Sequence, residues 1–190
     1  PGDSAYLNRT PSATGNRKTW TWSGWVKRSG LGTTTTLFES RSGSSDTTMM
    51  KLYFDPSDQL WVVNYSYFPL KTSQVFRDVS SWYHIVWVLD VTQSTASDKM
   101  KLYVNGIEIT SFVADSRSSL GSNNQAINLA QGHWIGAQQG TADYFNGYLA
   151  DVHFIDGQAL TPTDFGELDD NGVWQPKKFA GTYNTSAVDY

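Results

Sequence analysis

Residues 82–108, WYHIVWVLDVTQSTASDKMKLYVNGIE, decide the fold, because they predict two strands and a tight turn into a third. Residues 82–89 are mostly aromatic and β-branched and carry no formal charge, so neither face of that strand is suited to water. From Met100 to Val104 apolar and polar side chains alternate, as in a strand with one buried face. Asn105-Gly106 can adopt the positive φ angles of a two-residue type I′ turn, so the chain should reverse directly into Ile107 and Ile109.

The composition favours a single β-rich domain. Hydrophobic residues make up 39% of the 190 residues and charged residues 17%, below the roughly 25% that is usual. The net charge of -4 argues against a surface built for nucleic acid, which needs clustered Lys and Arg. The absence of cysteine excludes disulfides and thiolate metal sites. The uncharged run near residue 82 is far shorter than the roughly 20 residues that span a bilayer, so we expect no membrane insertion.

The remaining patterns predict short strands separated by turns, and almost no helix. The predicted strands are residues 5–7, 19–28, 35–40, 49–54, 60–65, 127–130, 133–137 and 144–155. Thr161-Pro162 with Asp164 predicts one short helical turn within residues 161–167. Two antiparallel sheets packed face to face, or a barrel, would use these strands, and the two long aromatic-rich strands favour the β-sandwich.

Two long strands indicate which side chains fill the interior. In residues 19–28, Trp20, Trp22, Gly24 and Val26 share one face, and Gly24 leaves room for a neighbouring ring. In the last strand, Tyr148, Ala150, Val152 and Phe154 oppose Leu149, Asp151, His153 and Ile155. We assign Trp20, Trp22 and Trp82 to the core. We expect the sandwich to occupy residues 1–170, and residues 171–190 to lead into the rest of a longer chain.

Four segments, in this order, resemble the laminin-G-like (LamG) jelly rolls of the concanavalin A-like lectin and glucanase superfamily. They are WTWSGWVKR (20–28), WYHIVWVLD (82–90), KLYVNG (101–106) and FNGYLADVHFIDGQALTPTDF (145–165). The last segment, with GELDDNGVWQPKKFAGTY after it, is also similar to virion proteins of bacteriophages. That second resemblance implies a module of a tail fibre, spike or other extracellular virion surface, with other virion subunits as partners.

The resemblance raises the possibility of glycoside hydrolysis, but the acidic residues argue against an enzyme. The glucanase branch carries an E-x-D-x-x-E strand that places nucleophile and acid in one cleft. Here Glu39, Glu108 and Glu167 are isolated, and Glu167-x-Asp169 follows the helical turn instead of lying in a strand. A GxSxG elbow is also absent. We therefore expect a non-catalytic module and keep a glycoside hydrolase as an alternative.

We predict no metal site and no cofactor, with calcium left open. His84, His133 and His153 lie on separate predicted strands, where single histidines are more often packed than coordinating. The family resemblance implies calcium at the rim of some such sandwiches. Oxygen ligands are available at Asp143, Asn146 and Asp151, or at Asp90 and Asp98. Closing turns is the more common role of such Asp side chains.

Sugar binding requires an aromatic plate with planar polar groups beside it. The stretch NYSYFP (64–69) is the best candidate, because aromatic residues depart from the strand pattern there and a proline follows. The predicted glycan-binding residues are Trp61, Tyr65, Tyr67, Phe68 and Tyr144. Alternatively, Tyr67 and Phe68 cover a sheet edge as a small cluster.

These observations predict a carbohydrate-binding module that recognises glycan on a host surface. The alternative is a structural virion module, serving as decoration, as a spacer or in the formation of a homo-oligomer, without glycan binding.

Overall fold

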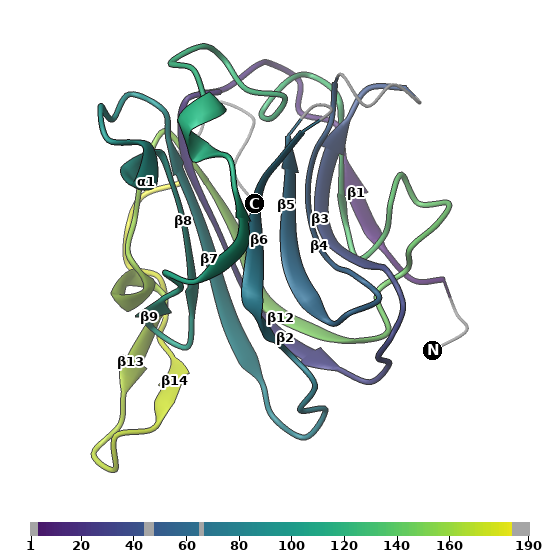
Figure 1. The fold of residues 1–190 in the computed structure, drawn as a ribbon, viewed down its shortest axis with the longest axis vertical. Helices are drawn as coiled ribbons and strands as arrows, with labels where there is room; N and C mark the ends of the chain where they lie inside the picture. Colours follow the sequence, from purple (N-terminus) through teal and green to yellow (C-terminus); the bar gives the residue numbers. More distant parts are fainter. Residues whose placement is uncertain (1–3, 44–47, 65–66, 184–190) are drawn as a thin grey trace.

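The computed structural model describes residues 4–43, 48–64 and 67–183, and it shows two antiparallel sheets packed face to face (Figure 1). This architecture confirms the predicted all-β sandwich. Within the described residues, no helix is long and apolar enough to cross a membrane.

The larger sheet has seven strands among the described residues. In spatial order they are β1 (Leu7–Arg9), β11 (Gly132–Ile135), β3 (Thr35–Arg41), β4 (Met50–Phe54), β5 (Gln59–Asn64), β6 (Tyr67–Val75) and β10 (Phe112–Asp115). Strands β6 and β10 were not predicted. In β6, Pro69 and a polar stretch interrupt the alternation of apolar and polar residues, and β10 lies next to a Ser-rich loop. Residues 127–130, predicted as a strand, form none, since Asn128 has a φ of 59° that interrupts extended backbone.

The smaller sheet has five strands in the described part of the chain. In spatial order they are β12 (Gly147–Asp156), β2 (Thr19–Arg28), β7 (Tyr83–Asp90), β8 (Met100–Val104) and β9 (Ile107–Glu108). Strand β7 lies in the middle and is buried on both faces, as its uncharged sequence predicts. Asn105 and Gly106 join β8 to β9 with φ angles of 49° and 82°, which confirms the predicted turn.

Short elements complete the fold. The predicted helical turn is η3 (Pro162–Asp164), closed by a reciprocal capping box between Thr161 and Asp164. Two further single turns, α1 (Ala96–Lys99) and η2 (Arg117–Ser119), lie in connections between strands. A C-terminal hairpin pairs β13 (Gly166–Leu168) with β14 (Trp174–Pro176), and it projects from the lower end of the sandwich in Figure 1.

Aromatic rings from both sheets interlock in the core. Trp20 meets Trp87 edge to face, with 4.6 Å between ring centroids, and stacks on Phe154 at 5.4 Å. Phe38 of the larger sheet stacks on Phe154 at 5.6 Å and lies 6.3 Å from Trp22. All five side chains are fully buried, which confirms the core assignment of Trp20 and Trp22.

The core assignment of Trp82 is wrong. Its side chain is 38% exposed, and its ring lies 6.5 Å from that of Tyr148. In β7 the odd-numbered residues Ile85, Trp87 and Leu89 face the core. Trp82 precedes the strand at an even position, so strand alternation directs it outward.

A β-bulge in β12 also changes the predicted alternation. The register with β2 shifts between Ala150 and His153, and Asp151 has a left-handed φ of 46°. As a result Leu149 and Val152, three residues apart, both pack against the core. Tyr148, predicted to share a face with Val152, is 63% exposed.

The C-terminal hairpin is fastened to the outer face of the smaller sheet through His84. Trp174 Nε1 donates a hydrogen bond of 3.0 Å to His84 Nδ1, so the neutral imidazole carries its proton on Nε2 and donates it to Ser23 Oγ at 2.9 Å. Trp25 and Trp174 stack on the imidazole at 4.9 and 5.9 Å. The segment after residue 170 therefore contacts the sandwich through Trp174. The division of the chain at residue 170 stays a prediction.

Gly24→Ala is expected to lower the free energy of unfolding by about 1–3 kcal/mol, because overpacking a rigid core forces strain. A Cβ at Gly24 would lie 2.7 Å from Cη2 of the fully buried Trp22. Urea denaturation measures the change. Gly121→Ala is the matched control, since a Cβ at Gly121 would lie 3.7 Å from its nearest neighbouring atom, Nδ2 of Asn123. This control should change the free energy of unfolding by less than about 0.5 kcal/mol. Equal effects of the two substitutions would contradict the packing.

Stability should fall as the pH drops from about 6.5 toward 4. Burial lowers the pKa of both His84 and His133 to about 4. In the unfolded chain the pKa of histidine is about 6.5, so between pH 6.5 and 4 the unfolded chain binds protons that the folded chain does not. Each histidine therefore lowers the free energy of unfolding by roughly 3 kcal/mol once the pH is below its folded-state pKa. Urea denaturation across this range should show the loss, and His84→Gln should reduce the slope by about one proton. An unchanged slope in the variant would contradict the assignment.

Candidate functional site

The outer face of the larger sheet carries an aromatic and charged cluster centred on Trp61. Strand alternation places Leu60 and Val62 in the core, and directs Trp61 of β5 to the outer face. Trp61 pairs across the sheet with Tyr53 of β4 and Lys71 of β6. We define the Trp61 face as Lys51, Tyr53, Asp55, Trp61, Lys71 and Asp143.

A lysine is held between the Trp61 ring and a carboxylate. Lys71 Nζ lies 4.4 Å from the ring centroid of Trp61 and 3.0 Å from Asp55 Oδ2. Asp55 is fixed in turn, because its Oδ1 accepts hydrogen bonds from the backbone N–H groups of Ser57 and Gln59. The ammonium, ring and carboxylate are therefore ordered before any ligand arrives, which lowers the entropic cost of binding.

A second lysine connects the face to the loop between β11 and β12. Lys51 Nζ donates to Asp143 Oδ2 at 2.8 Å and to Gln138 Oε1 at 2.7 Å, and lies 4.7 Å from the ring centroid of Tyr53. Burial, followed by the nearby charges of Asp55 and Asp143, raises the pKa of Tyr53 well above its usual value. Tyr53 is therefore a neutral phenol in any physiological buffer, and its ring centroid lies 5.9 Å from that of Trp61.

Glu39 lies beneath this loop and does not reach solvent. Its side chain is fully buried, and Oε2 accepts a 2.8 Å hydrogen bond from the Gln139 backbone N–H. Burial is the largest influence on its pKa and raises it, against the lowering effects of that hydrogen bond and of Lys51. A carboxyl group in this position can brace the loop, but it has no access to a ligand on the surface.

Two of the predicted glycan-binding residues, Trp61 and Tyr144, have described side chains, and they lie in different surroundings. Trp61 is the centre of the Trp61 face, and Tyr67 begins β6, where it pairs with Asn64. Tyr65 lies outside the described residues, as do the side chains of Tyr67 and Phe68. Tyr144 packs 6.4 Å from Tyr6 and donates to the Gly140 carbonyl at 2.7 Å.

Trp61 is the one member of the Trp61 face that was predicted to bind glycan. Asp143 was considered as a calcium ligand, and the sequence analysis missed Lys51, Tyr53, Asp55 and Lys71. The alternation in residues 50–54, MKLYF, contained a signal, because it places Lys51 and Tyr53 opposite the buried Met50, Leu52 and Phe54. Lys71 and Asp143 lie in β6 and in a long loop, where no short-range pattern indicates their neighbours.

No group of three or more His, Asp or Glu side chains suited to a metal gathers within residues 4–43, 48–64 and 67–183. Three of the carboxylates considered for calcium have protein partners: Asp143 pairs with Lys51, Asp98 pairs with Lys101, and Asp90 accepts hydrogen bonds from Thr92 and Gln93. The three histidines lie apart on β7, β11 and β12. His133 bonds the Gln131 carbonyl and His153 bonds Tyr183.

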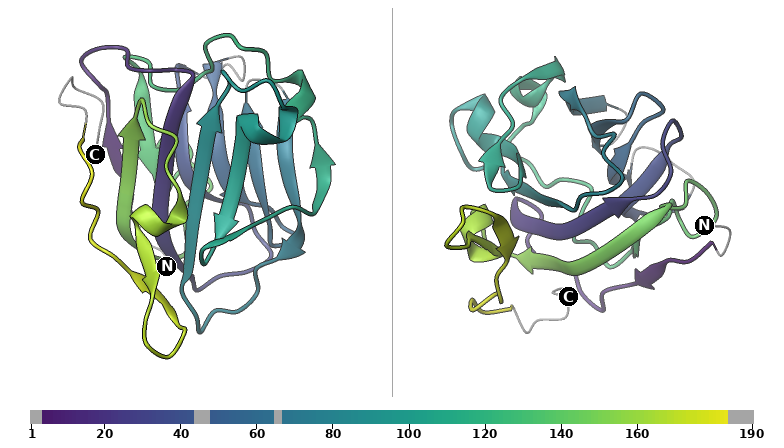
Figure 2. Two further views of the ribbon diagram at one scale, coloured as in Figure 1. Left: turned by 90° about the vertical axis from the view of Figure 1, so that its left-hand side faces the viewer. Right: turned by 90° about the horizontal axis from the view of Figure 1, so that it is seen from below.

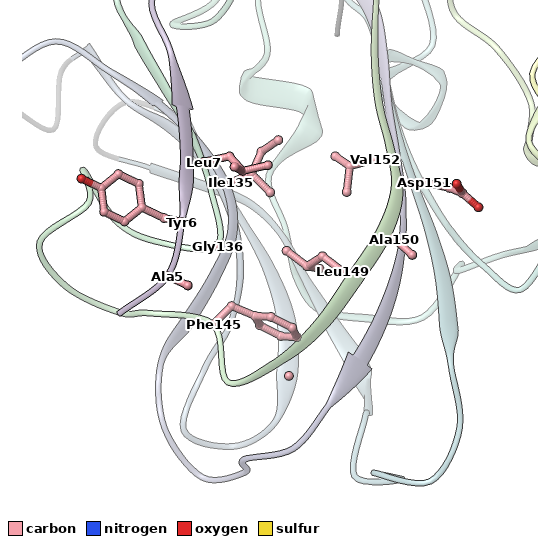
Figure 3. Close-up of a pocket in the computed structure, with 11 residues that line it drawn as sticks. Ala5, Tyr6, Leu7, Ile135, Gly136, Phe145, Leu149, Ala150, Asp151 and Val152 are labelled. Atoms are coloured by element: carbon pink, nitrogen blue, oxygen red, sulfur yellow. The ribbon is translucent and has the colours of Figure 1, made fainter. Parts of the chain in front are cut away.

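A separate groove of about 560 Å³ opens between the edges of the two sheets (Figure 3). Its apolar side chains come from β1, β11 and β12 and the residues just before β12, and we call them the edge seam: Leu7, Ile135, Phe145, Leu149 and Val152. Asp151, the charged residue of this lining, points to the other side of β12 (Figure 3). The seam offers few partners for sugar hydroxyls, so its chemistry suits apolar side chains better than glycan.

A protein-family model matches most of the chain. A laminin-G family model of the concanavalin A-like lectin/glucanases superfamily matches residues 1–164. Comparison with curated proteins found no match.

Several solved structures share this fold. A heptameric SAP-like pentraxin from Limulus polyphemus is 20% identical with a TM-score of 0.57, over 82% of this chain and 71% of the pentraxin. Domain 4 of AbnA, a GH43 extracellular arabinanase from Geobacillus stearothermophilus solved with arabinotriose, is 19% identical with a TM-score of 0.55, over 78% and 65%. The CBM40 of a Ruminococcus gnavus IT-sialidase, solved with α2,3 sialyllactose, is 14% identical with a TM-score of 0.51, over 85% and 96%.

Identities this low establish the fold alone. The chain also matches Trypanosoma rangeli sialidase, but it spans only 22% of that enzyme's chain.

Proposed function

The chain belongs to the concanavalin A-like lectin/glucanases superfamily, and from this premise we propose that it is a non-catalytic carbohydrate-binding module that holds glycan on the Trp61 face. The observation that carries the proposal is the ordered set of Trp61, Lys71 and Asp55, an aromatic plate flanked by an ammonium and a carboxylate. We propose that the indole face not covered by Lys71 packs against the C–H face of a pyranose, while the charged groups hydrogen-bond its hydroxyls. Solved complexes of similarly folded modules with arabinotriose and sialyllactose support this ligand class.

The predicted aromatic residues border this surface along the chain. Tyr65, Tyr67 and Phe68 follow β5 directly, and Tyr144 follows Asp143. We propose these four residues as further contacts to the glycan.

The environments of the carboxylates support binding over hydrolysis. A glycosidase needs two carboxyl groups roughly 5 to 9.5 Å apart across the substrate, one of them protonated at working pH. On the Trp61 face, Asp55 and Asp143 each form an ion pair with a lysine, and Glu39 is buried beneath the loop. Glu108 lies 3.9 Å from Lys101 on the other sheet. The ion pairs of Asp55 and Asp143 support hydrogen bonding to a ligand over proton transfer.

The setting we propose is the exposed surface of a bacteriophage particle, where the module recognises host-surface polysaccharide. The resemblance of residues 145–183 to virion proteins supports this setting. The proposed module needs no cofactor, and calcium at the rim, which the laminin-G-like resemblance implies, is left open. An antibody against this domain should label intact particles if the setting is correct.

A second candidate function is a structural contact between two copies of this chain through the edge seam. Leu7 on the outermost strand of the larger sheet is 69% exposed, and β12 is the outermost strand of the smaller sheet. Edge strands beside an apolar groove favour association with another chain.

Trp61→Ala is expected to weaken glycan binding at least about tenfold, because the aromatic plate is lost. A glycan array followed by calorimetry, with and without calcium, measures the effect. Trp82→Ala is the matched control, since Trp82 is 38% exposed on the other sheet, and it should leave binding unchanged. Absence of array binding by the wild-type chain, or equal losses in the two variants, would contradict the proposal.

If the edge seam joins two copies, sedimentation should show a wild-type oligomer that Leu7→Asp converts to monomer. A charge buried in an apolar contact carries a large desolvation cost. Ile107→Asp should leave the oligomer intact, because this residue is 74% exposed on β9, at the edge of the smaller sheet opposite β12. A wild-type monomer at micromolar concentration would remove this candidate.

A further inference from the structure

A second cavity, of about 440 Å³, lies on the outer side of the smaller sheet, where the C-terminal segment runs beside β12 (Figure 2). Its lining includes Asp151, His153, Lys177, Lys178, Phe179 and Tyr183. None of these residues belongs to the Trp61 face or contributes a side chain to the edge seam. The cavity combines aromatic rings with charges of both signs.

One wall is a set of mutually packed rings. His153 lies 6.0 Å from Phe179 and 6.2 Å from Tyr183, and those two rings meet edge to face at 5.3 Å. Phe165 stacks behind Phe179 at 5.1 Å. His153 Nδ1 and the Tyr183 hydroxyl are 2.7 Å apart, within hydrogen-bond distance. The wall is therefore formed before a ligand binds.

Two lysines adjacent in sequence supply positive charge to the lining of this cavity. Lys51, Lys71 and Lys101 each form an ion pair with a carboxylate. Within the described residues, neither Lys177 nor Lys178 forms such a pair. Lys177 Nζ donates to the Thr163 carbonyl at 3.1 Å, which positions the charge without neutralising it. In a chain of net charge -4, this arrangement favours an anionic group at the cavity.

The bulge in β12 brings a carboxylate to the same cavity. Asp151 is exposed, and its left-handed backbone turns the side chain away from the edge seam toward the outer side of β12 (Figure 3). Bulges commonly redirect side chains in this way next to binding sites. A carboxylate there repels a simple polyanion, but accepts hydrogen bonds from hydroxyl groups.

We infer that this cavity is a second saccharide site, selective for an acidic sugar that carries both a carboxylate and hydroxyl groups. The sugar's carboxylate would lie near Lys177 and Lys178, its C–H face against the rings of Phe179 and Tyr183, and a hydroxyl on Asp151. A neutral sugar would form no ion pair with the lysines, and phosphate alone would not pack against the rings. The site lies on a different sheet from the Trp61 face, so the inference goes beyond the proposed function.

The test compares methyl β-D-glucuronide with methyl β-D-glucoside, which differ in one carboxylate, by NMR titration of the full chain at low salt. The glucuronide should bind at least about tenfold more tightly, with a preference that weakens as ionic strength rises, because exposed charges are screened. Lys177→Ala/Lys178→Ala should remove most of that preference. The control Lys18→Ala/Lys27→Ala, equal in charge change and outside the cavity lining, should preserve it.

Several outcomes would overturn the second site. They are equal binding of the two sugars, binding of neither sugar, and equal losses in the two double variants. Trp61→Ala separates the sites, since the glucuronide preference should survive in that variant. If Trp61→Ala abolishes the preference, the acidic sugar binds at the Trp61 face, and the inference fails while the proposed function stands.

Discussion

The interlocking of Trp20, Trp22, Trp87 and Phe154 with Phe38 joins the two sheets, and the rest of the molecule depends on it. Fully buried rings in edge and stacked contacts contribute both a large apolar area and a defined geometry. Without disulfides, this packing must offset most of the conformational entropy lost on folding. Because the interior is filled, recognition is left to the outer faces and edges of the sheets.

Those outer surfaces have different chemistry. The larger sheet presents Trp61 with paired lysines and carboxylates, whereas the smaller sheet is covered by a C-terminal segment that is fastened through His84 and Trp174. The open side between the sheets is apolar. A single scaffold thereby carries the Trp61 face, the edge seam and the charged cavity on three separate surfaces, so substitutions at one surface should leave the others intact.

The sequence predicts the fold correctly where the signal lies in neighbouring residues. Alternation in β2 and the Asn105-Gly106 turn indicate strands and a hairpin from adjacent residues alone. Trp82 and the faces of β12 were misassigned, because an outward strand position and a bulge at Asp151 depend on pairing with β2. The site was harder still: Trp61 was identified as an aromatic residue, but its partners Lys71 and Asp55 come together only through sheet register.

If glycan lies on the Trp61 indole, binding should disturb that ring and leave the core tryptophans, which hold the sheets together, undisturbed. The most direct measurement follows the indole N–H resonances of the eight tryptophans during titration with a bound oligosaccharide. We expect the Trp61 resonance to move, and those of Trp20, Trp22 and Trp87 to stay in place. Movement of Trp82 or Trp174 with a stationary Trp61 would contradict it.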